Sequence, residues 1–183
     1  GIYYKPDVNF GGVQGGAIHT HACDTRVAGA VEEMIAAIWL HGPLDGLVNN
    51  AAGNFIARTE DLSPRGFDAI ANIVLHGSFY VTQAVGKRWV AERRGGSIIS
   101  IVTTWVWTGS AFVVPSAMSK AGIAAMTQSL AVEWGPKGIR LNAIAPEGAK
   151  RAACCADVGV VDVAVDDIGA DAVAMNEAAT GIG

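Results

Sequence analysis

Two side chains that could act together, Ser116 and Lys120, stand four residues apart in a stretch with helical periodicity. Residues at this spacing project from one face of a helix, so a hydroxyl and an ammonium group can meet near its first turn. Ligands of open α/β sheets bind beyond the carboxyl ends of the strands. We therefore expect one small-molecule site, formed by the residues at and beyond the carboxyl ends of the predicted strands: Asp24, Asn49 to Asn54, Thr103 to Trp107, and Ala145 with Pro146.

Alternating strands and helices are predicted to position these residues. Ser63 and Pro64 supply an N-cap and a first-turn proline for a helical region that reaches about Arg94. Val27 to Ile38 and residues 116–134 also have helical spacing. Buried strands are predicted at 18–23, 44–49, 97–102 and 139–144. The pattern indicates one α/β domain with a three-layer parallel sheet and helices on both faces.

Composition narrows the class of protein. The chain has 183 residues, 51% of them hydrophobic, and a formal net charge of −4, so it can bury a core and lacks the basic excess that nucleic acid binding needs. Cys23, Cys154 and Cys155 cannot form a disulfide framework. No run reaches about 18 uncharged apolar residues. These features predict a cytoplasmic protein with no membrane segment and no nucleic acid partner.

Two sequence blocks carry a resemblance to a known family. Asn49–Gly53 directly follows a predicted strand, and Ser116–Gly122 opens a predicted helix. Together with Leu130–Gly135 and Ile139–Pro146, they resemble the short-chain dehydrogenase/reductase family over about residues 18–146. The resemblance implies a Rossmann-like fold, a nicotinamide cofactor and a homo-oligomer assembled through regions 63–94 and 116–135.

Within that family, Asn54-Phe55 and Thr108–Ala117 resemble the 2,4-dienoyl-CoA reductases. That resemblance implies NADP as the cofactor, with NAD not excluded, and hydride transfer to an unsaturated acyl-CoA thioester. It implies that Asn54 helps hold the thioester oxygen, where a preorganised donor is commonly worth about 3–4 kcal/mol. Phe55 and Ser63 lie where those enzymes contact the acyl-CoA.

The resemblance also implies roles toward the cofactor. Lys120 is expected to bind the nicotinamide ribose, Ser116 to orient Lys120, and Asp24 to contact the adenine. The remaining expected cofactor-binding residues are Asn50, Ala51, Gly53 and Pro146.

The catalytic tyrosine of the family is replaced in this chain. The classical position, four residues before the lysine, is Ser116, and the dienoyl-CoA reductase position, fifteen before it, is Trp105. An indole N–H can donate to an enolate but cannot deliver a proton near neutral pH. We therefore include Trp105 among the catalytic residues, although packing of a loop is an equally good role for it, and we expect impaired activity.

The two ends of the chain depart from the family. The phosphate-binding glycine motif is absent before residue 18, and Gly11–Gly16 is better interpreted as a loop. The fold is therefore expected to be incomplete, without its first two strands, and with atypical ends at 1–17 and 147–183. The alternating segment 158–165 could pair beside 44–49 or beside 139–144. The competing function is a catalytically silent remnant or scaffold that keeps part of the fold.

No metal site is predicted. His19, His21 and Cys23 would share one face of a strand, but the sequence offers no second cluster to complete a coordination shell.

Overall fold

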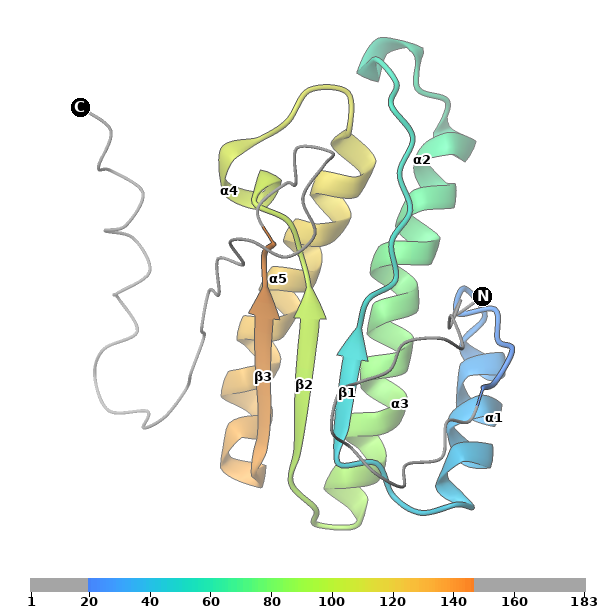
Figure 1. The fold of residues 1–183 in the computed structure, drawn as a ribbon, viewed down its shortest axis with the longest axis vertical. Coiled ribbons are helices and arrows are strands. Elements are labelled where there is room, and N and C mark those ends of the chain that lie inside the picture. The colour runs from blue at the N-terminus through green and yellow to red at the C-terminus, as the bar shows by residue number, and fades with distance from the viewer. Residues whose placement is uncertain (1–19, 147–183) are drawn as a thin grey trace, which may run out of the picture.

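The computed structural model describes residues 20–146, which form a parallel three-stranded sheet with its helices (Figure 1). The strands are β1 (Gly46–Asn49), β2 (Gly96–Ile101) and β3 (Ile139–Ile144), in the order β1-β2-β3. Gly46 pairs with Ser97, and Gly96 pairs with Ile139. All three carboxyl ends therefore lie at one edge of the sheet, as the sequence predicted.

Helices connect the strands in the predicted order. The long helices are α1 (Ala28–Trp39), α3 (Gly77–Ala91) and α5 (Val114–Trp134). The shorter elements are the 3-10 turns η1 (Thr59–Asp61) and η3 (Gly135–Lys137), the helices α2 (Pro64–Ala71) and α4 (Trp105–Thr108), and η2 (Asn72–His76), which has π-helical geometry. The prediction of an α/β fold with a parallel sheet is confirmed.

Local sequence explains where these helices begin and end. The Ser63 hydroxyl accepts a hydrogen bond from the Gly66 amide at 3.1 Å, and Pro64 occupies the first turn, so α2 begins where the N-cap signal predicted. The last turn of α5 leads into η3, and Gly138 then adopts a left-handed conformation with φ of 78°. Glycine reaches this conformation at little cost, which allows the chain to turn directly into β3.

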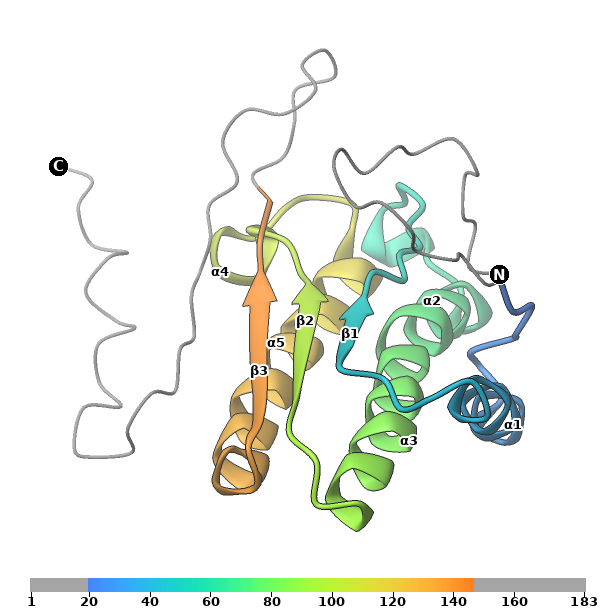
Figure 2. The ribbon, with the colours of Figure 1, turned by 60° about the horizontal axis from the view of Figure 1, so that its bottom comes forward.

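The core lies between the sheet and the helices α3 and α5, which cover the same face of the sheet (Figure 2). Trp89 and Val85 of α3 pack with Ile98 of β2 and Leu141 of β3, and all four are almost fully buried. Val48 of β1 keeps 61% of its surface exposed. Among the described residues, α3 and α5 cover one face of the sheet. The prediction of helices on both faces therefore stays a prediction.

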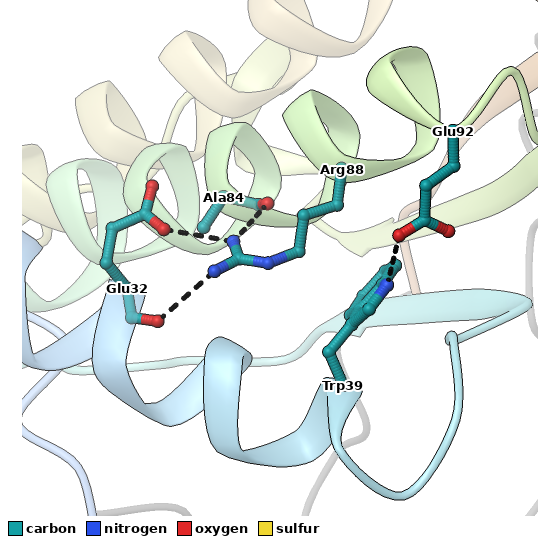
Figure 3. A network of polar contacts seen from close by, with 5 residues as sticks. All are labelled: Glu32, Trp39, Ala84, Arg88 and Glu92. Atoms are coloured by element: carbon teal, nitrogen blue, oxygen red, sulfur yellow. Dashed lines mark hydrogen bonds and ion pairs between the residues drawn. The ribbon is translucent and has the colours of Figure 1, made fainter.

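Polar contacts fasten α1 to α3 at the side of the sheet (Figure 3). One guanidinium nitrogen of Arg88 donates to Glu32 Oε2 and to the carbonyl of Ala84, each at 2.9 Å. The Trp39 indole donates to Glu92 Oε1 at 2.7 Å, and the Arg88 guanidinium carbon lies 5.8 Å from the centre of a Trp39 ring. These contacts set the position of α1, and with it the position of the chain that leads into α1.

The strand predicted at 18–23 is wrong over residues 20–23, the part that the structure describes. Residues 20–24 are irregular and lead through a turn into α1. A strand needs a partner for its backbone groups, and β1, the edge strand of the described sheet, pairs only with β2. Residues 18 and 19, the end segments 1–17 and 147–183, and the predicted strand 158–165 lie outside the described residues.

Within residues 20–146, the helices are too short or too polar for a membrane span.

Candidate active site

Lys120 lies at the carboxyl edge of the sheet, on the second turn of α5. Its ammonium donates to the carbonyl of Ala51, two residues beyond β1, at 3.1 Å, and to the carbonyl of Ile101, the last residue of β2. Only 7% of the residue is exposed, and this burial lowers its pKa from the usual value. A single charged group therefore joins the ends of two strands.

Ser116 and Trp105 lie at the same end of the fold as Lys120. Ser116 is one turn earlier on α5 and is buried, with 7% of its surface exposed. Trp105 opens α4 only four residues after Ile101, whose carbonyl accepts from Lys120. Of these three residues, Lys120 is hydrogen-bonded to the end of β2, while Ser116 precedes it by one turn and Trp105 follows that strand closely in the chain.

The two adjacent asparagines at the end of β1 have different environments. Asn49 is buried, and its amide donates to the hydroxyl of Thr82 at 2.8 Å and to that of Ser100 at 3.4 Å. Asn50 is exposed. Asn49 therefore ties β1 to α3 and β2, and Asn50 is the one that can reach a ligand.

Asp24 lies in a tight turn beside a pocket. The Val27 amide donates to the Asp24 carbonyl at 3.0 Å, and the Arg26 amide donates to Asp24 Oδ1 at 3.0 Å. The Arg26 guanidinium contacts both carboxylate oxygens, at 2.8 and 2.7 Å, and these hydrogen bonds lower the Asp24 pKa to about 2. The carboxylate is therefore held ionised and in a fixed orientation.

The pocket beside Asp24 has a volume of about 670 Å³. It brings residues of the turn together with residues from the loop after β1 and from η2. Its lining is Ala22, Cys23, Asp24, Thr25, Arg26, Ala52 and Ile73. Of the residues that the sequence expected to share one site, Asp24 and Ala52 therefore line this pocket together.

The residues expected to contact an acyl-CoA lie in the segment that leads from β1 to α2. Asn54 is exposed, and Phe55 is 39% exposed. The Phe55 ring lies against Gly66, close to the Ser63 hydroxyl that caps α2. Ser63 therefore has a structural role in the N-cap, whatever else it contacts.

A main-chain hydrogen bond joins this segment to the loop after α4. The Ala57 amide donates to the carbonyl of Phe112 at 3.1 Å, and Phe112 has a φ of 66°. This left-handed conformation is strained for a residue with a bulky side chain. The hydrogen bond holds the two loops beside each other at the carboxyl edge of the sheet. Pro146 is exposed and follows β3 at the same edge.

Sequence reasoning missed Arg26, Ile73 and Phe112. Asp24 and Arg26 two residues apart before a helix could have indicated an ion pair within a turn, whereas Phe112 carries no signal for a positive φ. Ile73 lies in η2, and π-helical turns interrupt helices without a sequence pattern that periodicity can detect.

Within residues 20–146, no three His, Cys, Asp or Glu side chains come close enough to hold a metal ion. His21 and Cys23 are described, and His19 lies outside the described residues. Burial raises the pKa of the Cys23 thiol, with a smaller contribution from the neighbouring Asp24 carboxylate, so the thiolate is disfavoured. The glycine-rich segments at 11–16 and 180–183 also lie outside the described part of the chain.

Comparison with solved structures supports the fold and its family. A crystal structure of a short chain dehydrogenase from Bacillus anthracis is 50% identical, with a TM-score of 0.66, and the match covers 67% of this chain and 52% of that one. NAD⁺-bound xylitol dehydrogenase is 27% identical, with a TM-score of 0.66, over 69% of this chain and 49% of that one.

Comparison by sequence gives the same family. A probable 2,4-dienoyl-CoA reductase of Bacillus subtilis is 45% identical over 133 residues, which is 72% of this chain and 52% of the relative. A probable 2,4-dienoyl-CoA reductase of Caenorhabditis elegans is 51% identical over 102 residues, 56% of this chain and 33% of the relative. The chain therefore spans about half or less of the length of these relatives.

The family model described as enoyl-(acyl carrier protein) reductase matches residues 12–177. This match covers most of the chain and includes the Asn49–Gly53 and Ser116–Gly122 blocks together with the Lys120 site. The chain belongs to the short-chain dehydrogenase/reductase family of oxidoreductases.

Proposed function

We propose that this protein binds NADP(H) and carries the site for reduction of a 2,4-dienoyl-CoA thioester, with slow turnover. The observation that carries the proposal is the position of Lys120, whose buried ammonium lies where the ends of β1 and β2 meet. A ribose placed there can accept hydrogen bonds from an ammonium that is already oriented. The 2,4-dienoyl-CoA reductases among the relatives supply the substrate class.

The residues of the described site fit part of a dinucleotide. Lys120 can bond a ribose, and the pocket of about 670 Å³ beside Asp24 can take an adenine, whose amino group would donate to the ionised carboxylate. Arg26 adds a cation at the same pocket. The glycine-rich segments at 11–16 and 180–183 lie outside the described residues, and these contacts concern the ribose and the adenine alone.

The reaction sets clear tasks for the side chains. A bound reduced nicotinamide supplies the hydride. When the hydride adds to the conjugated dienoyl thioester, the electron pair moves to the thioester oxygen, and one proton must then be added to give a neutral enoyl thioester. The exposed Asn54 amide can donate a hydrogen bond to that oxygen. This hydrogen bond would stabilise the negative charge that develops on the thioester oxygen.

Proton delivery is the weak step of this site. The Trp105 indole can donate a hydrogen bond but does not titrate near neutral pH, so the proton must come from water. Ser116, at the other family position for the tyrosine, is buried and is an equally poor acid. Because neither position carries an effective acid, we expect slow turnover. The same lack of an acid favours the alternative function, a catalytically silent remnant of the fold.

Fluorescence titration of the full chain with NADPH tests the proposal. Replacing Lys120 with Ala removes a charge-assisted bond to the ribose and should weaken binding by about 1.5–3 kcal/mol, or roughly ten- to a hundredfold. Lys87→Ala, at an exposed position of α3, is the matched control and should leave the affinity unchanged. A wild-type protein that binds neither NADPH nor NADH would favour the remnant, and equal affinity in both variants would remove Lys120 from the site.

We also propose that the chain self-associates through α3 and α5. Phe79 of α3 and Met118 and Val132 of α5 are 42%, 55% and 64% exposed. Met118 and Val132 lie on one face of α5, since fourteen residues make about four turns. Light scattering at micromolar concentration should find an oligomer that Val132→Lys dissociates and that Leu40→Lys, at an exposed residue after α1, does not. A monomeric wild-type protein would contradict this assembly.

A further inference from the structure

The turn that carries Asp24 rests directly on a glycine of the helical layer. A Cβ atom placed on Gly77 would lie 2.8 Å from Thr25 Oγ1, 3.2 Å from Thr25 Cβ and 3.4 Å from the Thr25 carbonyl oxygen. Real Cβ atoms essentially never approach another atom as closely as 2.8 Å. Thr25 therefore occupies the space that a side chain at position 77 would need.

The backbone does not require glycine at this position. Gly77 has φ of −59° and ψ of −45°, which are ordinary helical values, and it begins α3. Alanine would raise helix propensity here, as it does at other helical glycines. The contact with Thr25 is thus the physical reason why residue 77 can have no side chain.

A π-helical element directly precedes the glycine that meets the turn. η2 ends at His76, and its wider turn changes the angular position of the following residues around the helix axis relative to an unbroken α-helix. Gly77 and Ser78 are buried, and the Ser78 hydroxyl donates to the Val74 carbonyl at 2.7 Å within the same segment. Ile73 of η2 lines the pocket that Asp24 also lines. The same segment therefore forms a wall of the pocket and the support of the turn.

A displacement at Thr25 would move the whole turn. Asp24 and Arg26 are held together by the two side-chain contacts and the amide contact described above, and the Val27 amide closes the turn onto Asp24. A push on Thr25 would therefore shift the carboxylate and the guanidinium together relative to Ala52 and Ile73, which also line the pocket.

We propose that Gly77 is a positioning residue for this pocket: the absence of a side chain at Gly77 sets the position of the Asp24–Arg26 turn and so the width of the pocket that receives the adenine end of the dinucleotide. The nature of the ligand rests on the proposed function above. The contact between Gly77 and Thr25 does not depend on which ligand the pocket binds.

The experiment compares two Gly→Ala substitutions in helices near the same pocket. For Gly77→Ala, we expect the dissociation constant of NADPH to rise at least tenfold. Gly29→Ala, on α1, is the matched control because a Cβ atom there would have no neighbour within 4 Å, and its affinity should stay within twofold of the wild type. Equal effects of the two substitutions would overturn the proposal.

Rescue at Thr25 separates positioning from simple destabilisation. In the Gly77→Ala background, Thr25→Ala removes the hydroxyl that lies 2.8 Å away and should restore the affinity to within about threefold of the Thr25→Ala single variant. Thr25→Ser keeps the hydroxyl and should not restore it. Rescue by both substitutions, or by neither, would overturn the proposal.

Two further measurements cover the remaining cases. If Gly77→Ala does not fold, Thr25→Gly loosens the turn from the other side, and an unchanged dissociation constant would then overturn the proposal. If the wild type binds no adenine nucleotide, the proposed function fails independently. Thermal unfolding midpoints then test the contact: Gly77→Ala should lower the midpoint and Thr25→Ala should recover it, and a midpoint at or above that of the wild type would show that the contact does not constrain the turn.

Discussion

The ammonium of Lys120 lies 3.1 Å from the carbonyl oxygen of Ala51, so the residue at the centre of the candidate site is also a structural link between α5 and the loop after β1. The second bond of Lys120, to the Ile101 carbonyl, extends this link to β2. A ligand bound by Lys120 would therefore be held by a side chain that the protein itself keeps in place. Preorganisation of this kind reduces the ordering cost of binding.

Removal of this link should cost stability in a way that depends on pH. Lys120→Met leaves two strand-end carbonyls without their donor, and we expect the free energy of unfolding to fall by about 1–3 kcal/mol at neutral pH. Burial lowers the pKa of Lys120 in the folded chain, whereas the unfolded chain keeps the usual value of 10.5. Between these values the unfolded chain binds more protons, so the contribution of Lys120 to the free energy of unfolding rises with pH.

The difference in unfolding free energy between wild type and Lys120→Met should accordingly widen as the pH is raised from neutral toward 10.5. Urea denaturation at several pH values measures it. Lys87→Met, at an exposed position, should show no such trend. A difference that stays constant with pH would contradict the assignment of a depressed pKa to Lys120.

The two adjacent asparagines provide an internally controlled test of the site. Asn49→Ala removes the donor to Thr82 and Ser100 in a buried setting and should lower the free energy of unfolding by about 1–3 kcal/mol. Asn50→Ala, at an exposed position, should change it by less than about 0.5 kcal/mol. Chemical denaturation gives both values, and similar losses for the two variants would show that the buried hydrogen bonds contribute little.

Restoration of an acid should reveal which branch of the family the site follows. Trp105→Tyr introduces a phenol at the position of the dienoyl-CoA reductase tyrosine, close to the end of β2, and should raise turnover of a 2,4-dienoyl-CoA. Ser116→Tyr must instead place a phenol at a buried position and should raise it less. Steady-state assays with NADPH rank the two variants, and the reverse order would move the protein to the carbonyl-reducing branch.

The ion pair of Asp24 and Arg26 should be visible by titration. In the wild type the Asp24 carboxyl should titrate with a pKa of about 2, and Arg26→Gln should raise this pKa toward 3.8, because the hydrogen bonds from the guanidinium are lost while that from the residue 26 amide remains. The contribution of this pair to stability is present above pH 3.8 and disappears as the pH falls toward 2. Carbon-detected NMR of the carboxyl group follows the titration, and identical curves for the two proteins would exclude the pair in solution.

Regular elements with a strong local signal could be predicted from the sequence. The helix predicted over 116–134 from apolar spacing is observed over 114–134, and the N-cap at Ser63 follows from the Ser63-Pro64 pair. The strand expected before residue 24 fails in its described part, because apolar content favours a strand only where a neighbour can pair with it.

The candidate site was less predictable, since its geometry depends on contacts between distant segments. The sequence places Lys120 at the edge of the sheet but does not reveal that main-chain carbonyls would be its partners. The strained Phe112 and the contact of Thr25 with Gly77 likewise depend on tertiary packing. Local sequence pattern therefore indicates at which edge of the sheet a residue lies, but it does not indicate the hydrogen-bond partners of its polar groups.

The parallel register of the sheet has a consequence for how fast the protein folds. Gly46 pairs with Ser97 and Gly96 with Ile139, so each pair of strands joins residues that are separated by at least one complete helix. Such pairings are made only after a long loop has closed, and proteins dominated by them fold slowly. During synthesis β1 is made before β2. Until β2 has been made, β1, which carries the exposed Val48, has no β2 to pair with. Early formation of α3, which shortens the gap between β1 and β2, should therefore set the pace of folding.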